Sequence, residues 1–303
     1  MNRASIICMV FFGLIYAAQA QKIANNTVEQ QLRVLEERSG GRLGLSAINM
    51  DNEQRIQYRG EERFPAGCTA KVIGVAALLK KSELNASLLN KKVQYTEKDL
   101  VNWTPITGKH VHEGMSVQDL CAAAISYSDN TAMNLLVNEL GGLEQMNQFA
   151  KSLGDTAFRQ DHGWPEEALS SPFDKTDSTT PQAMEQSFRK ILFDNALTQA
   201  NRELLKNWLI HNVTGNKRIR AGVPQGWTVG DKTGSGFHYG TTNDIAVIWP
   251  PQCKPIVITI YYSSNQKDAP LREDILASAT KIVLNEFGRT NSCVAKALRS
   301  STV

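Results

Sequence analysis

Net charge is what this sequence has least of. The 303 residues include 33 lysines and arginines and 30 aspartates and glutamates, so the formal net charge is +3. So small an excess, spread evenly, does not indicate a nucleic-acid partner or an anionic membrane face. Hydrophobic residues make up 42% of the chain, which excludes a disordered or fibrous protein and is enough for a full core. The composition therefore favours a small-molecule partner, and the length one large domain or two smaller ones.

Metal-binding patterns are also missing. The chain has 5 cysteines and 5 histidines, with no C-x-x-C or H-x-x-x-H spacing. We therefore expect neither a metal site nor a cofactor. Apart from Cys8, four cysteines remain, and in an oxidising compartment they can pair in three ways: Cys68, Cys121, Cys253 and Cys293. The sequence leaves that pairing open.

The first twenty residues have the pattern of a secretory signal peptide. Arg3 precedes an apolar run from Ile6 to Ala18, and the small residues around Gln19 lead to a cut after Ala20. A membrane anchor is the alternative, but this run is shorter than the ~20 residues needed to span a bilayer. We expect cleavage near Ala20 and export, to the periplasm or the medium, of a monomer without a membrane anchor.

Hydrophobic periodicity predicts strands near both ends of the mature chain and helices between them. A helix through Val28, Leu32 and Leu35 ends at Gly40-Gly41, and strands at 43–48 and 55–58 flank a turn. Further helices are expected at about 68–82, 117–126, 131–140, 143–152, 181–194 and 199–211. Strands return at 227–232, 244–249 and 256–262, before an amphipathic helix at 275–287. This order predicts an α+β fold, in which the two ends build one layer and the helices form an insertion.

Three short stretches carry the residues suited to chemistry. In Cys68-Thr69-Ala70-Lys71, the i, i+3 spacing places the thiol and the ammonium on one helical face, where the cation and the helix N-terminus favour a thiolate. Ser128-Asp129-Asn130 precedes a helix, and Lys232-Thr233-Gly234-Ser235-Gly236 ends a strand. Taken singly, these are a buried structural cysteine, a helix N-cap and a turn. Their ordered combination is far less probable by chance.

Together these stretches resemble the S-x-x-K, S-D-N and K-T-G motifs of class A β-lactamases. The resemblance runs from about Thr27 to Phe287 and is closest to the CTX-M-type branch, through strings such as 39–44, 127–134 and 240–250. It implies an antiparallel sheet with flanking helices, built from 21–60 and 212–290. It also implies a helical domain at 61–211 that includes an Ω-loop at about 159–181, and a tail at 291–303.

The departures from this family fall on its catalytic positions. Cys68 stands where the family has its nucleophilic serine. In the Ω-loop, Trp164 replaces the general-base glutamate, and Ala168 replaces the asparagine that helps to hold the hydrolytic water. The arginine and aspartate that tie the loop together become His162 and Asp177, which puts half of that ion pair in doubt.

The resemblance implies a role for each retained residue. Cys68 attacks the carbonyl with Lys71 as its charge partner or base, Ser128 protonates the leaving nitrogen, and the backbone N–H groups of Cys68 and Ser235 form the oxyanion hole. The substrate-binding positions are Trp103, Asn130, Lys232, Thr233, Gly234, Ser235 and Arg272. For Trp103, the alternative is a tryptophan of the core.

The expected activity is hydrolysis of a β-lactam through a covalent acyl-enzyme whose deacylation is slow, because the general base is missing. Glu166 and Glu167 lie close enough in sequence to replace that base only if the loop is rebuilt. A catalytically degenerate protein that binds β-lactams or peptidoglycan fragments is the first alternative. A D,D-peptidase-like acyl transferase shares the three motifs, but it does not explain the resemblance outside them.

Overall fold

The computed structural model describes residues 27–166 and 171–301. The expected signal peptide and its cleavage site at Ala20 lie outside the described residues. Within the described ranges, no helix combines the length and the apolar character needed to cross a membrane.

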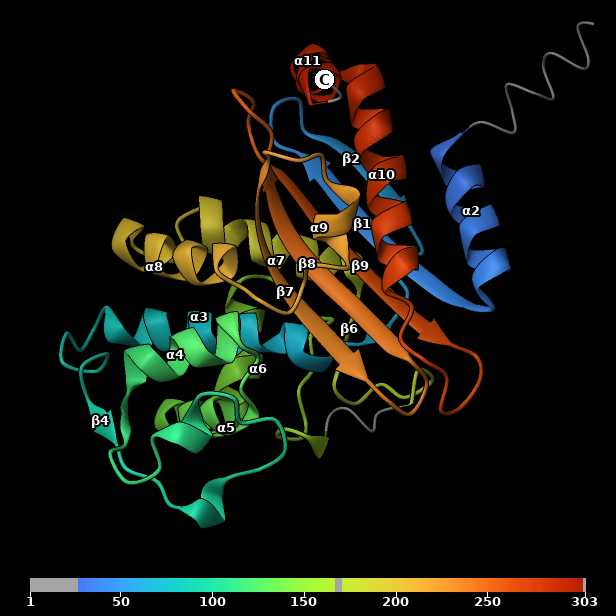
Figure 1. Cartoon of the computed structure of the whole chain (residues 1–303). Helices are drawn as coiled ribbons and strands as arrows, with labels where there is room; N and C mark the ends of the chain where they lie inside the picture. The colour runs from blue at the N-terminus through green and yellow to red at the C-terminus, as the bar shows by residue number, and fades with distance from the viewer. Residues whose placement is uncertain (1–26, 167–170, 302–303) are drawn as a thin grey trace, which may run out of the picture.

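A five-stranded antiparallel sheet forms the centre of the molecule, in the order β2-β1-β9-β8-β7 (Figure 1). Its strands are β1 (Gly41–Asn49), β2 (Gln54–Tyr58), β7 (Thr228–Gly236), β8 (Thr241–Trp249) and β9 (Ile256–Ser264). The first and last parts of the chain meet where β1 pairs with β9, with Leu45 opposite Ile260. The sheet predicted from the sequence is therefore confirmed.

Helices cover both faces of this sheet (Figure 1). One face carries α2 (Val28–Ser39), α9 (Ile219–Gly222), α10 (Glu273–Thr290) and α11 (Ser292–Ser300). The other face is turned to the helical segment: α3 (Lys71–Ser82), α4 (Val117–Ser126), α5 (Asn130–Leu140), α6 (Leu143–Ser152), α7 (Pro181–Phe193) and α8 (Gln199–Ile210). Alternation along β8 divides the core, because Ile245 and Val247 join the cluster on the helical side, whereas Ala246 and Ile248 join the other.

Short elements connect the helices. They are β3 (Phe64–Pro65), η1 (Gly67–Ala70), β4 (Lys92–Val93), η2 (Glu97–Asp99), η3 (Thr107–Lys109), β5 (Met115–Ser116) and β6 (Ser178–Thr179). β3 pairs with β6, so the chain just before Cys68 lies beside the end of the expected loop at 159–181. This pairing brings two segments that carry candidate residues together.

β7 extends four residues beyond the strand end predicted at Lys232. The glycines in Thr233–Gly236 lower the strand propensity of this stretch, but its pairing with β8 (Gly234 opposite Asn243) continues to Gly236. A side chain at Gly234 would lie 3.2 Å from the backbone nitrogen of Cys68. The glycine therefore allows the backbone of this strand to approach the helix that carries the thiol.

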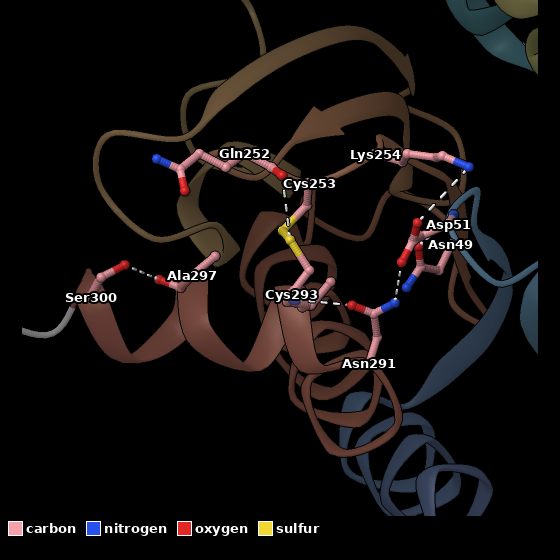
Figure 2. The surroundings of a disulfide bond; sticks show 10 residues. Asn49, Asp51, Gln252, Cys253, Lys254, Asn291, Cys293, Ala297 and Ser300 are labelled. Carbon is pink, nitrogen blue, oxygen red and sulfur yellow. Dashed lines mark hydrogen bonds and ion pairs between the residues drawn. A yellow bond between two sulfur atoms is a disulfide. The ribbon is translucent and has the colours of Figure 1, made fainter.

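The C-terminal segment is the largest difference from the sequence prediction, which assigns no element after 290. Ser292–Ser300 forms α11, and the side chain of Asn291 caps it by accepting a hydrogen bond from the Val294 backbone N–H at 3.0 Å. A disulfide between Cys253 and Cys293 ties this helix to the turn between β8 and β9 (Figure 2). This settles the pairing that the sequence leaves open, while Cys68 and Cys121 remain as thiols.

Candidate active site

The thiol and the ammonium of the first motif lie at the junction of η1 and α3. Lys71 is fully buried, and its Nζ donates hydrogen bonds to the backbone oxygen of Ser128 (2.7 Å) and to Oδ1 of Asn130 (2.6 Å). A longer bond of 3.3 Å reaches the backbone oxygen of Asp129. Cys68 Sγ lies 3.9 Å from the same Asn130 Oδ1. The first two motifs are therefore in contact, as the resemblance implies.

The middle motif turns sharply, with Ser128 in the left-handed region at φ 58°. Asp129 supports this turn: its carboxylate accepts from the Ala132 backbone N–H as the N-cap of α5, and from the backbone and side chain of Thr107. Such strain at a non-glycine residue persists only where the surroundings fix it. The N-cap interpretation of this motif therefore holds for Asp129, and the side chain of Ser128 does not cap the helix.

The third motif completes the cluster. Lys232 is fully buried, and its Nζ donates to Ser128 Oγ at 2.9 Å. On the same strand, Thr233 Oγ1 lies 2.6 Å from Thr214 Oγ1, and Ser235 Oγ accepts a hydrogen bond from Arg218 at 2.7 Å. Two ammonium groups, of Lys71 and Lys232, and the hydroxyl of Ser128 therefore lie around the Cys68 thiol.

Charge in this cluster favours the thiolate. Burial by itself raises the pKa of Cys68, but the charges of Lys71 and Lys232 and the hydrogen bonds from Ser128 and Lys71 outweigh burial, so the pKa lies below its ordinary value. Burial also lowers the pKa of Lys232 to about 7, with the charges of Lys71 and Arg218 acting in the same direction and those of Cys68 and Asp231 opposing. Cys121 lacks such partners, and burial raises the pKa of its thiol.

Backbone N–H groups approach each other at the mouth of the cluster. Gly67 has φ 53°, and a side chain there would lie 3.4 Å from the backbone nitrogen of Ser235. Together with Gly234 beside Cys68, it allows the backbone segments of Cys68 and Ser235 to lie side by side. An oxyanion hole made from the N–H groups of these two residues needs such an approach of their backbones.

Trp164 fills the space beside Lys71. Its side chain is fully buried, with the ring centroid 5.5 Å from Lys71 Nζ, and its indole Nε1 has no hydrogen-bond partner among the described residues. The Asn134 side chain binds both backbone groups of Trp164, by accepting from its N–H at 3.0 Å and donating to its oxygen at 2.6 Å. Among the described residues, an aromatic ring and no carboxylate therefore faces this side of Lys71.

Trp103 does not belong to the core, since 61% of its surface is exposed. Its indole Nε1 donates to the Tyr127 backbone oxygen at 3.0 Å, and its own backbone oxygen accepts from the Asn130 N–H at 3.0 Å. The ring is thus attached next to the middle motif. This position is consistent with a wall of the cleft rather than with the core alternative.

Comparison with known proteins identifies the family. The sequence profile of the "Beta-lactamase enzyme family" matches residues 27–287. The chain belongs to the β-lactamase family. It is 48% identical to "Beta-lactamase OXY-1" of Klebsiella oxytoca, over 93% of this chain and 97% of that one. It is 46% identical to "Beta-lactamase CTX-M-97" of Escherichia coli, over 94% and 98%.

Solved structures agree. The "Ancestral (GNCA) Beta-lactamase class A" superposes with a TM-score of 0.83 at 46% identity, and the alignment covers 86% of this chain and all of the other (100%). A β-lactamase from Desulfarculus baarsii gives a TM-score of 0.85 at 43% identity, with coverages of 86% and 97%. The expected class A fold is confirmed, and so is the expectation of an enzyme of the hydrolase class.

Within this β-lactamase fold, Arg272 precedes α10 and lies beside β8: its backbone N–H donates to Thr242 Oγ1 at 3.0 Å, and Thr242 is opposite Ser235. Its guanidinium donates to the carboxylate of Asp274 and to the backbone oxygen of Ser39. One contributing residue was not predicted: Arg218, which is almost fully buried, reaches Ser235 Oγ and the backbone oxygen of Gly234. No local motif marks Arg218, because α9 brings it to β7 only in the folded chain. Of the altered loop positions, Trp164 is described, whereas Ala168 lies outside the described residues.

Proposed function

We propose that this protein opens β-lactam rings by acyl transfer to Cys68 and that it hydrolyses the resulting acyl-enzyme slowly. The observation that carries the proposal is the contrast within one cluster. The thiol is surrounded by Lys71, Lys232 and Ser128, whereas Trp164 occupies the side of Lys71 from which a general base would act. The cluster thus provides the groups that acylation needs, and Trp164 stands where deacylation needs a general base.

Acylation follows from the hydrogen bonds of the cluster. The Cys68 thiolate attacks the ring carbonyl, a C–S bond forms, and the ring C–N bond breaks with its electron pair on nitrogen. Ser128 supplies a proton to this nitrogen and takes one from Lys232, which donates to its Oγ. Lys71 acts as the charge partner, because its ammonium lies beside the thiolate and is held there by bonds to the backbone oxygens of Ser128 and Asp129 and to Asn130 Oδ1.

The substrate is held by the remaining residues. The N–H groups of Cys68 and Ser235 stabilise the developing oxyanion, and one such donor is typically worth ~2.7–4 kcal/mol. The ring carboxylate lies against Lys232, Thr233 and Ser235. Asn130 and the exposed Trp103 contact the acyl side chain.

Under this proposal, Trp164 is the described side chain at the position from which a general base would assist deacylation. The loss of general-base help typically costs ~10²–10⁴-fold in rate. Glu166 is exposed, two residues beyond the buried Trp164, and we propose that it does not restore rapid turnover. Glu167 lies outside the described residues.

A chromogenic cephalosporin tests this proposal. We expect a burst of about one equivalent followed by a slow steady state, the kinetic sign of an accumulating acyl-enzyme. Mass spectrometry of the quenched protein should place the adduct on the peptide that contains Cys68. Cys68→Ala should abolish the burst, whereas Cys121→Ser, which alters a buried thiol away from the cluster, should leave it unchanged.

Two outcomes contradict the proposal. Rapid wild-type turnover with no adduct would show that another group serves as base, and Glu166→Gln would then identify or exclude Glu166. The absence of both adduct and turnover in the folded protein would favour the second candidate, a protein that binds β-lactams or peptidoglycan fragments without reacting. The buried Trp164 is compatible with that candidate, which makes the adduct the deciding observation.

We also propose that the chain is exported after cleavage near Ala20, acts as a monomer, and requires no metal or other cofactor. The near-neutral charge and the absence of an apolar run long enough to span a membrane after residue 20 support this reading.

A further inference from the structure

Side chains from outside the segment that carries Trp164 bind it at two points next to the ring, and Gln160 within the segment donates to the backbone oxygen of His162 at 2.9 Å. At one point, the Asn134 side chain binds both backbone groups of Trp164. At the other, Asp177 Oδ1 accepts hydrogen bonds from the backbone N–H groups of Asp161 (2.8 Å) and His162 (2.9 Å), while Asp177 Oδ2 lies 2.6 Å from His162 Nδ1. The seat of Trp164 on Lys71 therefore depends on two clamps, an amide clamp and a carboxylate clamp.

Only the carboxylate clamp has a side chain that titrates near neutral pH. The Asn134 amide is neutral at every pH. Asp177 is fully buried, and the His162 imidazole that faces it is 55% exposed. A protonated imidazole gives the carboxylate a charge-assisted hydrogen bond, whereas the neutral ring still donates from Nδ1 but without the charge. Deprotonation of His162 therefore weakens this clamp without removing its backbone bonds.

The surroundings of His162 are acidic on balance. The hydrogen bond and the charge of Asp177 raise the pKa of His162 most, partial burial opposes them, and Asp161 and Glu166 raise it further. Arg159 also lies nearby, but its guanidinium is bonded to the Asp161 carboxylate at 2.7 Å.

On the neighbouring segment, Arg63 donates to Ser178 Oγ at 2.8 Å. The pKa of His162 is raised in the folded protein. The charged hydrogen bond between His162 and Asp177 is therefore fully formed below the ordinary histidine pKa of about 6.5, and its charge is lost as the pH rises through the raised pKa.

We infer that His162 is a positioning residue of the proposed reaction: as an imidazolium paired with Asp177 it holds Trp164 on Lys71, and the loss of its charge shortens the lifetime of the acyl-enzyme. The inference rests on the proposed function. In deacylation, water adds to the thioester carbonyl, the C–S bond breaks, and Cys68 leaves as a thiolate. Trp164 is fully buried beside Lys71. When its ring is held there less firmly, water gains more access to this carbonyl.

Two variants bracket the wild type. His162→Arg keeps a positive charge at all working pH values, and His162→Gln is neutral throughout. The decay of preformed acyl-enzyme is measured from about pH 5.5 to about 9, and each variant is compared with the wild type at the same pH. The dependence on hydroxide and on the Cys68, Lys71 and Lys232 groups is common to all three proteins and cancels in the ratios.

The decay rate of the wild type should match that of a different variant at each end of this pH range. At acidic pH it should decay like His162→Arg, with His162→Gln faster by up to about fivefold, the scale of a partly exposed ion pair. At alkaline pH it should decay like His162→Gln, with His162→Arg slower. His211→Gln, a change in an exposed histidine on the α8 C-cap, is the control and should follow the wild type throughout. Rate ratios that stay constant with pH would overturn the inference.

Hydrogen exchange of the unreacted protein tests the clamp without any β-lactam. Protection of the backbone amides of Asp161, His162 and Trp164 should follow the same crossover between the two variants. If no acyl-enzyme forms in any variant, the proposed function fails, yet this experiment still decides whether His162 holds the segment. Equal protection of these amides in all three proteins at every pH would show that it does not.

Discussion

The disulfide between Cys253 and Cys293 should contribute a large part of the global stability and almost nothing to the chemistry. The perturbation is the double variant Cys253→Ser with Cys293→Ser. The bond spans 40 residues of sequence, and in the chain-entropy description a loop of that length contributes about 4 kcal/mol by restricting the unfolded chain. We therefore expect the free energy of unfolding to fall by about that amount.

The folded state of this variant should survive, because α11 has other contacts. Val294 and Ala297 are buried in the core cluster on this face of the sheet, and the Trp227 indole Nε1 donates to Ser301 Oγ at 2.9 Å. Asn291 donates to the Asp51 carboxylate at 2.8 Å in addition to capping the helix (Figure 2). Loss of the covalent bond thus changes mainly the entropy of the unfolded chain.

Urea titration followed by circular dichroism measures the effect, and the thermal midpoint should fall by roughly 8–16 °C at this chain length. Wild type in reducing agent should behave like the double variant, and Cys121→Ser, which closes no loop, should not show this loss. The bond lies beyond the Trp249 end of β8, whereas Lys232 and Ser235 lie opposite Ile245 and Thr242, four and seven residues and roughly 13 and 23 Å back along the strand. The rate of acylation should therefore be unchanged. An unchanged unfolding midpoint in the double variant would refute the reasoning.

Two further predictions concern the cluster. Iodoacetamide should modify Cys68 faster than Cys121, because the two lysines favour the Cys68 thiolate. Peptide mapping measures the two labelling rates, and the labelling of Cys68 should be slower in Lys71→Ala. Equal labelling rates for the two thiols would show that Cys68 is a structural cysteine and not a nucleophile. The pH dependence has a definite sign, because a lowered pKa preserves the reactive thiolate below the ordinary pKa of a thiol. Dialysis against EDTA should leave the acylation burst intact, and its strong loss would reveal a metal requirement that the sequence does not predict.

The part of the site that the sequence predicts is the part written in short local patterns. Cys68 and Lys71 share a helical face because of their spacing, and the strand after Trp227 delivers Lys232 to the cluster. Arg218 could not be found in this way, because its contact with Ser235 joins residues 17 positions apart through the packing of α9 against the sheet. Neither could α11, whose buried Val294 and Ala297 pack on a face of the molecule that only the folded chain assembles.

The two departures at the centre of the site are linked by charge. Lys71 and Lys232 are both fully buried, and within the part of the chain that the structure describes, the oxygens that accept hydrogen bonds from Lys71 Nζ are neutral amide oxygens. A ring face at 5.5 Å offers only weak compensation for a buried ammonium.

Asp231 offsets part of the charge of Lys232, and the Cys68 thiol is a group that can balance both lysines, since ionisation places a negative sulfur beside them. Under the proposed function, Trp164 at the position of a carboxylate takes away the base for deacylation and, by the same change, favours the thiolate that acts as nucleophile in acylation. Trp164→Glu should accordingly act in both directions, by accelerating decay of the acyl-enzyme and by raising the pKa of Cys68.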